Sequence, residues 1–364
     1  MVTTIKIPVK PLAGYLSAAA EITTGKSVLP ALSNILVEFD GSKIKLTNTN
    51  LTVTVVTSLP FESEFVGKLL LPAKKLSAAI NNIASENFFL TIDGNTVTVA
   101  EENGTFTVQL AVCDINEAPA TTVAETGDLM LDGRAFLEKI ATVKHAMGKD
   151  GATAGVRVDC NGRLSVVATD GARMAVVEEP STGAEKQMFF TIPADATAAL
   201  LKLMATEKTM GLAFNDEAIN MVGEITTVAI RCLSGTYPNY SGILQANQVD
   251  PDATVLIDRK MLTSAIERLS AVSGAIGTVT IKPTANGLEL SVEDDTTAAN
   301  TSVAAKKMPD VLPEPKSYSV GFLIAALAAG KSEELNLTLP TGAGKPLILS
   351  GAGVIEFMMP RITK

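Results

Sequence analysis

The sequence repeats one pattern six times, and this repetition favours a fold built from equivalent units. Each copy has an extended apolar stretch, then a Pro, Asp or Val, then a run with apolar residues at every third or fourth position. Proline at a first helical position and aspartate at an N-cap are typical of helix starts. Successive junctions are about 60 to 65 residues apart. They lie at Ile7-Pro8, Leu71-Pro72, Leu131-Asp132, Ile192-Pro193, Ile257-Asp258 and, more weakly, Ser319-Val320.

Each junction opens a window whose apolar spacing predicts an amphipathic helix. Short alternating stretches follow each window, and turn residues separate them. Asp93-Gly94 and Asn161-Gly162 are hairpin signals between such stretches. The repeated unit is therefore predicted to be one helix followed by an antiparallel meander. The six helical windows are 9–22, 73–83, 134–147, 194–204, 259–272 and 320–329.

The six units pair into three larger repeats of about 122 to 128 residues. The second half of each ends on a similar apolar strand, at 106–111, 228–233 and 354–359. Sequences typical of interdomain linkers lie near residues 121–128 and 245–253. We therefore expect an α+β protein of three repeated domains, each with two helices packed on antiparallel sheets. The predicted domains are residues 1–122, 123–250 and 251–364.

Composition excludes several classes of protein. The chain has 364 residues, of which 46% are hydrophobic, as expected for globular domains with a substantial core. No apolar run reaches the roughly 18 residues that span a bilayer, and the first residues lack the layout of a signal peptide, which predicts a cytoplasmic protein. With three separated cysteines and only His145, no metal, cofactor or catalytic constellation is indicated, so we expect no enzyme.

Charge is distributed unevenly between the helices and the rest of the chain. The net charge is −9, yet the six windows hold ten basic and four acidic residues, a net +6 that leaves −15 elsewhere. If the helices share one surface, that surface attracts a polyanion. Lysine and arginine are also good helix formers and are common on solvent-exposed helix faces. The charge asymmetry alone therefore leaves open both a polyanion-binding surface and ordinary exposed helix faces. The basic residues are Lys10, Lys74, Lys75, Arg134, Lys139, Lys144, Lys202, Arg259, Lys260 and Arg268.

Four motifs in this order, together with the threefold repeat, resemble the bacterial DNA polymerase III beta subunit, the sliding clamp. They are Leu-Pro-Ala-Leu-Ser-Asn-Ile-Leu at 29–36, Ala-Thr-Asp-Gly-Ala-Arg-Met-Ala at 168–175, Gly-Thr-Tyr-Pro-Asn-Tyr at 235–240 and Phe-Met-Met-Pro at 357–360. No single motif is specific, but the match runs from end to end. A bacteriophage-encoded clamp would carry the same motifs.

The resemblance implies processivity-fold domains that form a head-to-tail homodimeric ring around duplex DNA, with helices lining the hole. Packed helices are about 8–10 Å apart, so six enclose too little space and twelve leave a hole of roughly 25 Å. A duplex of about 20 Å fits that hole, which favours two copies. Contacts with double-stranded DNA would be sequence-independent and would include Lys26, which matches a DNA-contacting position of the family.

The family also has a cleft that receives a linear clamp-binding peptide from the replicative DNA polymerase, the clamp loader, and translesion or repair proteins. Methionine suits such a surface because it adapts to several partners. Here Ala172 is smaller than usual and Gly242 replaces a frequent arginine, which predicts a more open cleft. The matching positions are Thr153, Thr169, Gly171, Ala172, Arg173, Met174, Pro238, Gly242, Ile243, Phe322, Pro346, Phe357, Met358, Met359, Pro360 and Arg361.

One alternative is a non-enzymatic, repeat-built β structural or adhesion protein. The basic helices and the regular helix content count against it. The same cleft residues are also compatible with ordinary strand cores and turns, and only the resemblance favours a binding site.

Overall fold

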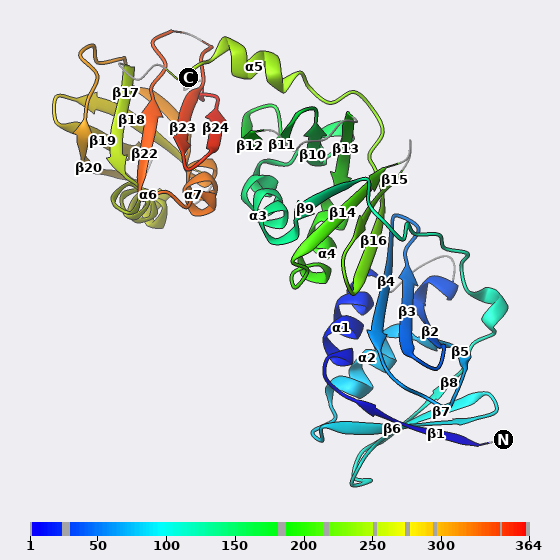
Figure 1. The fold of residues 1–364 in the computed structure, drawn as a ribbon. Helices are drawn as coiled ribbons and strands as arrows, with labels where there is room; N and C mark the ends of the chain where they lie inside the picture. The colour runs from blue at the N-terminus through cyan, green and yellow to red at the C-terminus, as the bar shows by residue number, and fades with distance from the viewer. Residues whose placement is uncertain are drawn as a thin grey trace. The chain divides into compact units, whose positions relative to one another are not determined.

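The computed structural model describes residues 2–23, 30–180, 187–214, 218–249, 253–273, 277–293, 297–342 and 344–361 (Figure 1). The chain forms two compact units, each built from two stretches of sequence. Unit 1 comprises Met1–Leu137 and Asp195–Cys232, and unit 2 comprises Glu138–Ala194 and Leu233–Lys364.

All six predicted helices are confirmed. The first begins later than its window because residues 9–11 form a turn that ends at the N-cap Pro11. A further helix among the described residues, α5, is not predicted from the sequence, because its short sequence has no apolar periodicity. The side chain of Asn239 caps α5 by accepting the N–H of Gly242. The helices are α1 (Leu12–Ile22), α2 (Ala73–Asn81), α3 (Gly133–Val143), α4 (Ala194–Leu203), α5 (Tyr240–Ala246), α6 (Arg259–Ser273) and α7 (Val320–Ala329).

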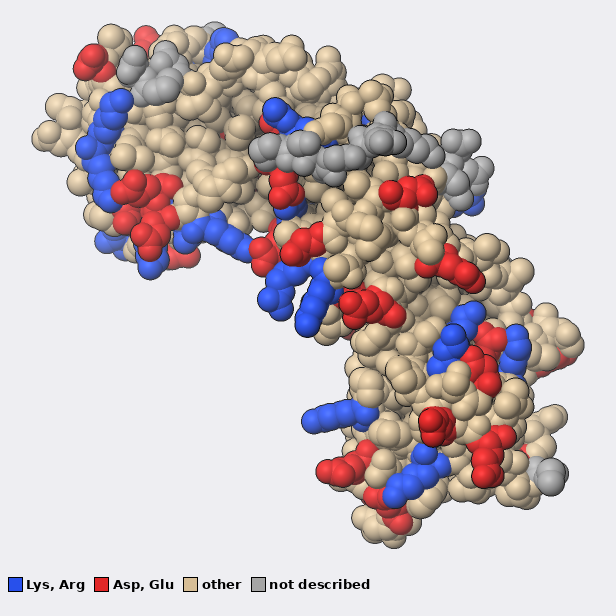
Figure 2. Space-filling model, viewed as in Figure 1, with Lys and Arg blue, Asp and Glu red and all other residues tan. Residues whose placement is uncertain are grey.

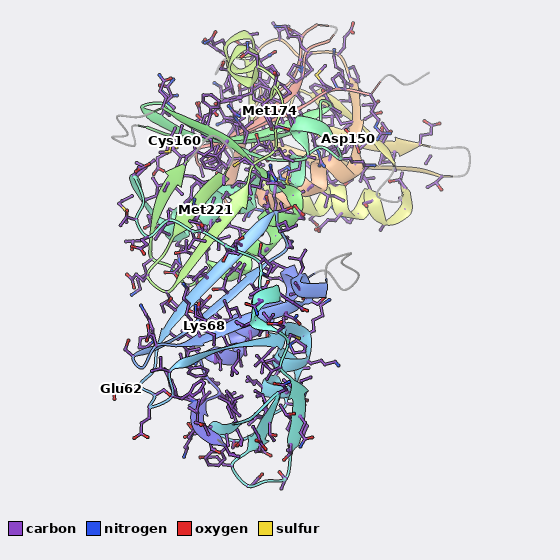
Figure 3. The ribbon with its side chains drawn as sticks, turned by 90° about the vertical axis from the view of Figure 1, so that its right-hand side faces the viewer. Glu62, Lys68, Asp150, Cys160, Met174 and Met221 are labelled. Atoms are coloured by element: carbon purple, nitrogen blue, oxygen red, sulfur yellow. The ribbon has the colours of Figure 1, made fainter. Side chains whose placement is uncertain are left out.

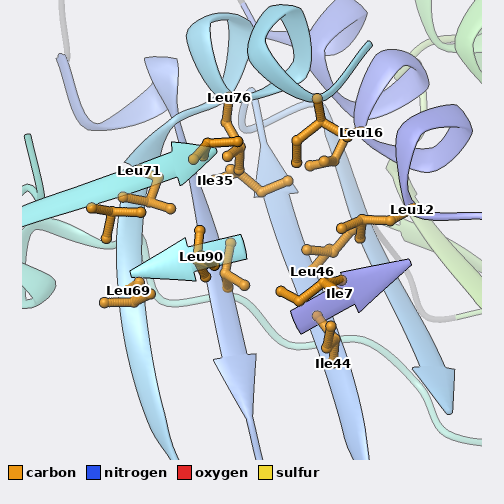
Figure 4. Packing of buried hydrophobic residues seen from close by; sticks show 14 of the residues in the cluster. Ile7, Leu12, Leu16, Ile35, Ile44, Leu46, Leu69, Leu71, Leu76 and Leu90 are labelled. Carbon is orange, nitrogen blue, oxygen red and sulfur yellow. The ribbon is translucent and has the colours of Figure 1, made fainter. Parts of the chain in front are cut away.

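The described strands of unit 1 form two antiparallel sheets, in the orders β1-β6-β7-β8 and β5-β2-β3-β4-β16-β15-β14-β9. Helices α1 and α2 pack beside each other, and their apolar residues, such as Leu16 and Leu76, enter a core shared with Ile35 and Leu90 (Figure 4). The strands are β1 (Thr3–Pro8), β2 (Asn34–Phe39), β3 (Lys43–Thr49), β4 (Val53–Pro60), β5 (Gly67–Pro72), β6 (Asn87–Asp93), β7 (Thr96–Glu101), β8 (Thr107–Ala111), β9 (Leu129–Asp132), β14 (Thr209–Phe214), β15 (Ala218–Val222) and β16 (Thr226–Arg231).

The described strands of unit 2 form one sheet in the order β13-β10-β11-β12-β24-β23-β22-β17-β20-β19-β18-β21. Helices α6 and α7 supply the core under its second half. The strands are β10 (Gly155–Cys160), β11 (Arg163–Thr169), β12 (Arg173–Pro180), β13 (Met188–Pro193), β17 (Thr254–Asp258), β18 (Thr278–Thr284), β19 (Gly287–Glu293), β20 (Ala298–Lys307), β21 (Lys316–Ser319), β22 (Glu334–Thr338), β23 (Leu347–Gly351) and β24 (Val354–Met358).

Two strand pairs join segments that are far apart in the sequence. β4 pairs with β16 through partners such as Val55 and Val228, and β12 pairs with β24 through partners such as Met174 and Phe357. The sheets therefore continue across both predicted domain boundaries. This continuity explains why the two compact units differ from the three repeats, and the division at 122 and 250 stays a prediction.

Candidate partner-binding and nucleic-acid surfaces

One face of the unit 2 sheet carries an apolar cluster at the junction of β12 and β24. Met174 pairs with Phe357, which in turn pairs with Ile348 on β23. Because side chains alternate along a strand and match across paired positions, these residues point to the same face. We call it the α5 face, since Leu244 of α5 packs on the cluster. The buried members of the cluster are Val167, Met174, Val176, Ile348 and Phe357.

A rigid turn borders this cluster at the end of β11. The Oδ1 atom of Asp170 accepts the backbone N–H groups of Ala172 and Arg173, both at 2.9 Å. Gly171 has a φ of +86°, a conformation that glycine adopts without strain. The N–H of Met359 donates to the carbonyl of Ala172 at 2.9 Å. The turn and the end of the chain's last strand are thus held together beside the apolar cluster.

Exposed apolar side chains lie on the segments that border the cluster. Met359, directly after β24, and Ile243, on α5, each keep 39% of their surface exposed, although both are apolar. Pro238 is also exposed, just before α5. Apolar groups above a buried apolar floor provide anchor points for one or two side chains of a linear peptide.

Three predicted cleft residues point to the opposite face of the sheet, which packs on α6 and α7. Met358 belongs to the core with those helices. The guanidinium carbon of Arg173 lies 4.1 Å from the ring centroid of Phe322 on α7, and its Nε bonds Asp170 at 3.0 Å. Arg173, Phe322 and Met358 therefore support the turn and the strand from behind, rather than lining the α5 face.

The remaining predicted cleft residues occupy varied positions. Thr169 is buried in the turn and donates to the carbonyl of Arg173. Thr153 is half-buried in a single 3-10 turn, and Pro346 is buried before β23. Gly242 lies inside α5, and a Cβ there would approach the Asn239 side-chain nitrogen to 2.9 Å. Pro360 is half-buried, and the exposed Arg361 donates its backbone N–H to Ser317.

The predicted DNA-binding residues fall into two groups by their interactions. Within the described residues, one group has exposed side chains without a hydrogen bond or ion pair. Figure 2 shows Lys and Arg side chains that project into solvent, with Asp and Glu side chains nearby. The helix pairs α1–α2 and α6–α7 each pack side by side, and the exposed residues Lys74, Lys75 and Lys260 lie on α2 and α6. The members of this free group are Lys10, Lys74, Lys75, Arg134, Lys144 and Lys260.

The other group is engaged within the protein. Lys139 bonds Glu179 at 3.0 Å, and Lys202 on α4 bonds Glu21 on α1 at 2.5 Å. Arg259 donates to two backbone carbonyls, at Ser332 and Leu327, and so closes the end of α7. Arg268 donates to a carbonyl of its own helix. Lys26 lies outside the described residues.

The sequence did not predict a buried acid–base pair behind the β12–β24 junction. The Nε2 atom of His145 lies 3.2 Å from Oε2 of Glu356 on β24, and Nδ1 lies 2.9 Å from the carbonyl of Thr142. Burial raises the pKa of Glu356, while His145 and Arg173 oppose that rise. The Oε1 atom of Glu356 has no hydrogen-bond partner within the described residues.

Other features of the described residues are structural. No group of three or more His, Cys, Asp or Glu side chains is placed to hold a metal ion in the described part of the chain. Burial raises the pKa of the Cys160 thiol to about 11, with a smaller contribution from Asp159. None of the described helices combines the length and apolar character of a membrane span.

Comparison with known proteins agrees with this architecture. The model of the DNA polymerase III beta subunit N-terminal domain matches residues 3–123, and that of its central domain matches residues 130–239. The beta sliding clamp of Synechocystis sp. is 26% identical over 95% of both chains, and that of Synechococcus elongatus is 24% identical over 90% of both.

Solved structures share the fold over the whole chain. The beta subunit from the DNA polymerase of Streptococcus pyogenes has a TM-score of 0.89 at 19% identity, covering 99% of this chain and all of the other. A sliding clamp from Pseudomonas aeruginosa bound to griselimycin has a TM-score of 0.88 at 19% identity, covering 99% of both chains. Since the two family models match more than half of its residues, the chain belongs to the DNA polymerase III beta subunit family of sliding clamps.

Proposed function

We propose that this chain is a processivity subunit that encircles duplex DNA as a head-to-tail homodimer and tethers a replicative polymerase, without chemistry of its own. The observation that carries the proposal is the match of both clamp domain models to most of the chain. We place its activity in the cytoplasm. The six helices found in the predicted windows support it, because two copies then supply the twelve helices that a duplex-sized hole requires.

The proposal predicts a dimer and a topological mode of DNA binding. The chain has a mass of 38.0 kDa, so sedimentation equilibrium at micromolar concentration is expected to give about 76 kDa. Clamps loaded on nicked circular DNA are expected to stay bound and to slide off once the circle is cut. A monomeric mass, or equal retention on circular and linear DNA, argues against a closed ring.

DNA binding by the free basic group supports sliding, because interactions with phosphates are sequence-independent and individually weak. Lys74 and Lys75 are exposed on α2 without a protein partner among the described residues. Replacing both by alanine is expected to lower the slope of log affinity against log salt by about 1 for each phosphate that the variant no longer neutralises. Fluorescence anisotropy with a labelled duplex measures this slope.

The matched control removes the same charge from the sheet. Lys43 and Lys45 on β3 pair loosely with acidic neighbours, at 3.9 and 3.8 Å. The Lys43→Ala, Lys45→Ala variant is expected to keep the wild-type salt slope. Equal slopes for the two double variants would place Lys74 and Lys75 away from the DNA.

Peptide docking on the α5 face is the second proposed activity. Met359→Ala and Pro360→Ala are expected to weaken binding of a labelled linear peptide from the replicative polymerase about tenfold together, because truncating an anchor side chain typically costs about 1–2 kcal/mol. The dimer mass should not change. Met261→Ala, which truncates a methionine on α6 that is more exposed than Met359, serves as the control. Unchanged peptide affinity in the Met359 variant refutes this assignment.

A further inference from the structure

A cavity of about 470 Å³ lies in unit 2 beside the candidate peptide site. Strands β10, β11 and β13 form its floor, and the segment before α5 forms one wall. Figure 3 shows the sheet with Cys160, which lines the cavity, and Met174, which belongs to the apolar cluster. None of the cluster's five buried members lines the cavity.

Strand register places the cavity and the apolar cluster on the same face of the sheet. Arg157 on β10 pairs with Val167 on β11, a member of the cluster. Asp159, two residues later, pairs with Phe189 on β13. Side chains at matched positions share a face, so Arg157, Asp159 and Phe189 all belong to the α5 face.

Two tyrosines form a wall that the two sites share. Tyr237 and Tyr240 pack against the apolar cluster, and both also line the cavity. The Tyr240 hydroxyl donates to Oδ2 of Asp159 at 2.8 Å, and the Tyr237 hydroxyl bonds the carbonyl of Val167 at 3.4 Å. Burial raises the pKa of both hydroxyls, which keeps them protonated as donors.

Arg157 is oriented so that part of its guanidinium remains available. Its Nε donates to Oδ1 of Asp159 at 2.6 Å, and its carbon lies 4.9 Å from the Phe189 ring centroid and 5.8 Å from that of Tyr237. The two terminal nitrogens have no hydrogen-bond partner within the described residues. A guanidinium fixed by stacking and a carboxylate presents two parallel donors to an incoming anion.

The surroundings favour a carboxylate attached to an apolar body. Phe189 is 61% exposed, and Met188 lines the same cavity. Both oxygens of Asp159 are already occupied as hydrogen-bond acceptors, from Arg157 and Tyr240. Arg163 at the rim is already paired with Glu178 at 3.1 Å. The volume falls within the usual range for small-ligand sites, about 300–1,000 Å³.

We propose that this cavity binds a carboxylate carried on an aromatic or apolar group, with Arg157 as the bidentate donor and Phe189 as the stacking surface. In the assembled clamp, the carboxylate comes from an acidic residue of a partner peptide, and an apolar side chain of the same peptide occupies the adjoining cluster. This assignment of the carboxylate to a peptide rests on the proposed function. Three strand spacings separate β10 from β24, roughly 14 Å, which an extended peptide covers in about four residues.

A small aromatic carboxylate tests the cavity independently of any peptide. We expect 2-naphthoate to bind the full chain at least about tenfold more tightly than neutral 2-naphthamide, because the amide cannot accept a charge-assisted pair of hydrogen bonds from Arg157. Isothermal titration or NMR shift mapping measures both. Arg157→Gln is expected to abolish the difference, whereas Arg163→Gln at the rim preserves it.

A second variant keeps the test informative if Arg157→Gln fails to fold. Phe189→Ala removes a largely exposed ring and is expected to weaken naphthoate binding severalfold while the thermal midpoint stays within about two degrees of wild type. Equal affinity of the acid and the amide for the wild-type chain overturns the site. So does naphthoate binding that neither Arg157→Gln nor Phe189→Ala weakens.

Peptide arms distinguish the source of the carboxylate. We compare labelled peptides that carry Asp or Asn four residues to either side of an apolar anchor pair. An Asp advantage of about threefold or more that disappears in Arg157→Gln supports the peptide source. Naphthoate binding without any Asp advantage restricts the site to small molecules and overturns that part. Failure of every peptide, with naphthoate still bound, contradicts the peptide-docking function and leaves the cavity intact.

Discussion

Glu207→Ala is expected to destabilise unit 1 by about 3 kcal/mol, because three backbone donors lose one shared acceptor. Glu207 follows α4 and is almost fully buried. Its carboxylate accepts the N–H groups of Glu224 at 2.7 Å, Ile225 at 3.3 Å and Thr226 at 2.9 Å. The turn between β15 and β16 is therefore built around this side chain.

The Glu207 side chain restricts position 223 to glycine and borders the junction of β16 with β4. A Cβ at Gly223 would lie 2.3 Å from the carboxyl carbon of Glu207. The carbonyl of Ile225, in the same turn, accepts the N–H of Ser58 on β4 at 2.9 Å. Loss of the carboxylate is thus expected to loosen the place where β16 joins β4 and where the eight-stranded sheet continues between two repeats.

Hydrogen exchange followed by mass spectrometry measures this effect locally. In Glu207→Ala, protection is expected to fall at Ile225, Thr226 and β4, and the first thermal transition should move down by several degrees. Glu224→Ala, which truncates an exposed neighbour in the same turn, should change stability by less than about 0.5 kcal/mol. If both variants retain wild-type protection, the carboxylate does not organise the turn.

The sequence predicted most of the helices and hairpins because their signals are local. Proline or aspartate before an apolar run marked the start of α2 and α6 correctly, and Asn161-Gly162 lies in the turn between β10 and β11. The exception is α5. Tertiary packing of Leu244 on the apolar cluster stabilises it, and periodicity over seven residues carries too little signal to predict such a helix.

Site residues were harder to predict, because function depends on which strands pair. The residues Met358 and Met359 are adjacent, yet one enters the core with α6 and α7 while the other is largely exposed. Only the β12–β24 register reveals this division. The hydrogen bonds of Glu207 join residues that are 17 or more positions apart in the sequence. His145 and Glu356 are 211 positions apart, so no local pattern could indicate either interaction.

His145→Ala is expected to destabilise the protein by an amount that depends strongly on pH. The carbonyl of Thr142 can only accept a hydrogen bond, so Nδ1 of His145 carries a proton. Its Nε2 then bonds Glu356 only if one proton is shared, either as imidazolium with carboxylate or as imidazole with carboxylic acid. Removing the imidazole therefore leaves the buried Glu356 carboxyl without its hydrogen-bond partner.

The pH dependence follows from proton counting. In the unfolded chain, histidine loses its proton near pH 6.5 and glutamate near 4.3. Burial raises the pKa of Glu356 in the folded protein, so this carboxyl contributes stability that is fully present below about pH 4.3 and is lost as pH rises through its folded-state pKa. The nearby Arg173 guanidinium opposes the rise in the pKa of Glu356.

The His145→Ala variant strengthens that dependence, because His145 opposes the rise in the pKa of Glu356. Burial alone then keeps the pKa of Glu356 raised, so the folded variant retains a proton that the unfolded chain releases above about pH 4.3. Stability relative to wild type is expected to fall as pH rises above about 4.5, by at most about 1.4 kcal/mol per pH unit. At pH 7 the total loss should reach about 3 kcal/mol, as for other broken buried pairs.

Calorimetric scans from pH 4.5 to 8 measure the difference between variant and wild type. Glu356→Gln in the His145→Ala background removes the titrating carboxyl while preserving its shape, so its stability relative to wild type should no longer fall across pH 4.5–6.5. A parallel slope for the single and double variants would show that another group titrates.

Peptide binding should report the same change, because Glu356 neighbours Phe357 in β24. The His145→Ala variant should bind the partner peptide more weakly at pH 7.5 than at pH 5.5, whereas the affinity of wild type should differ less between these values.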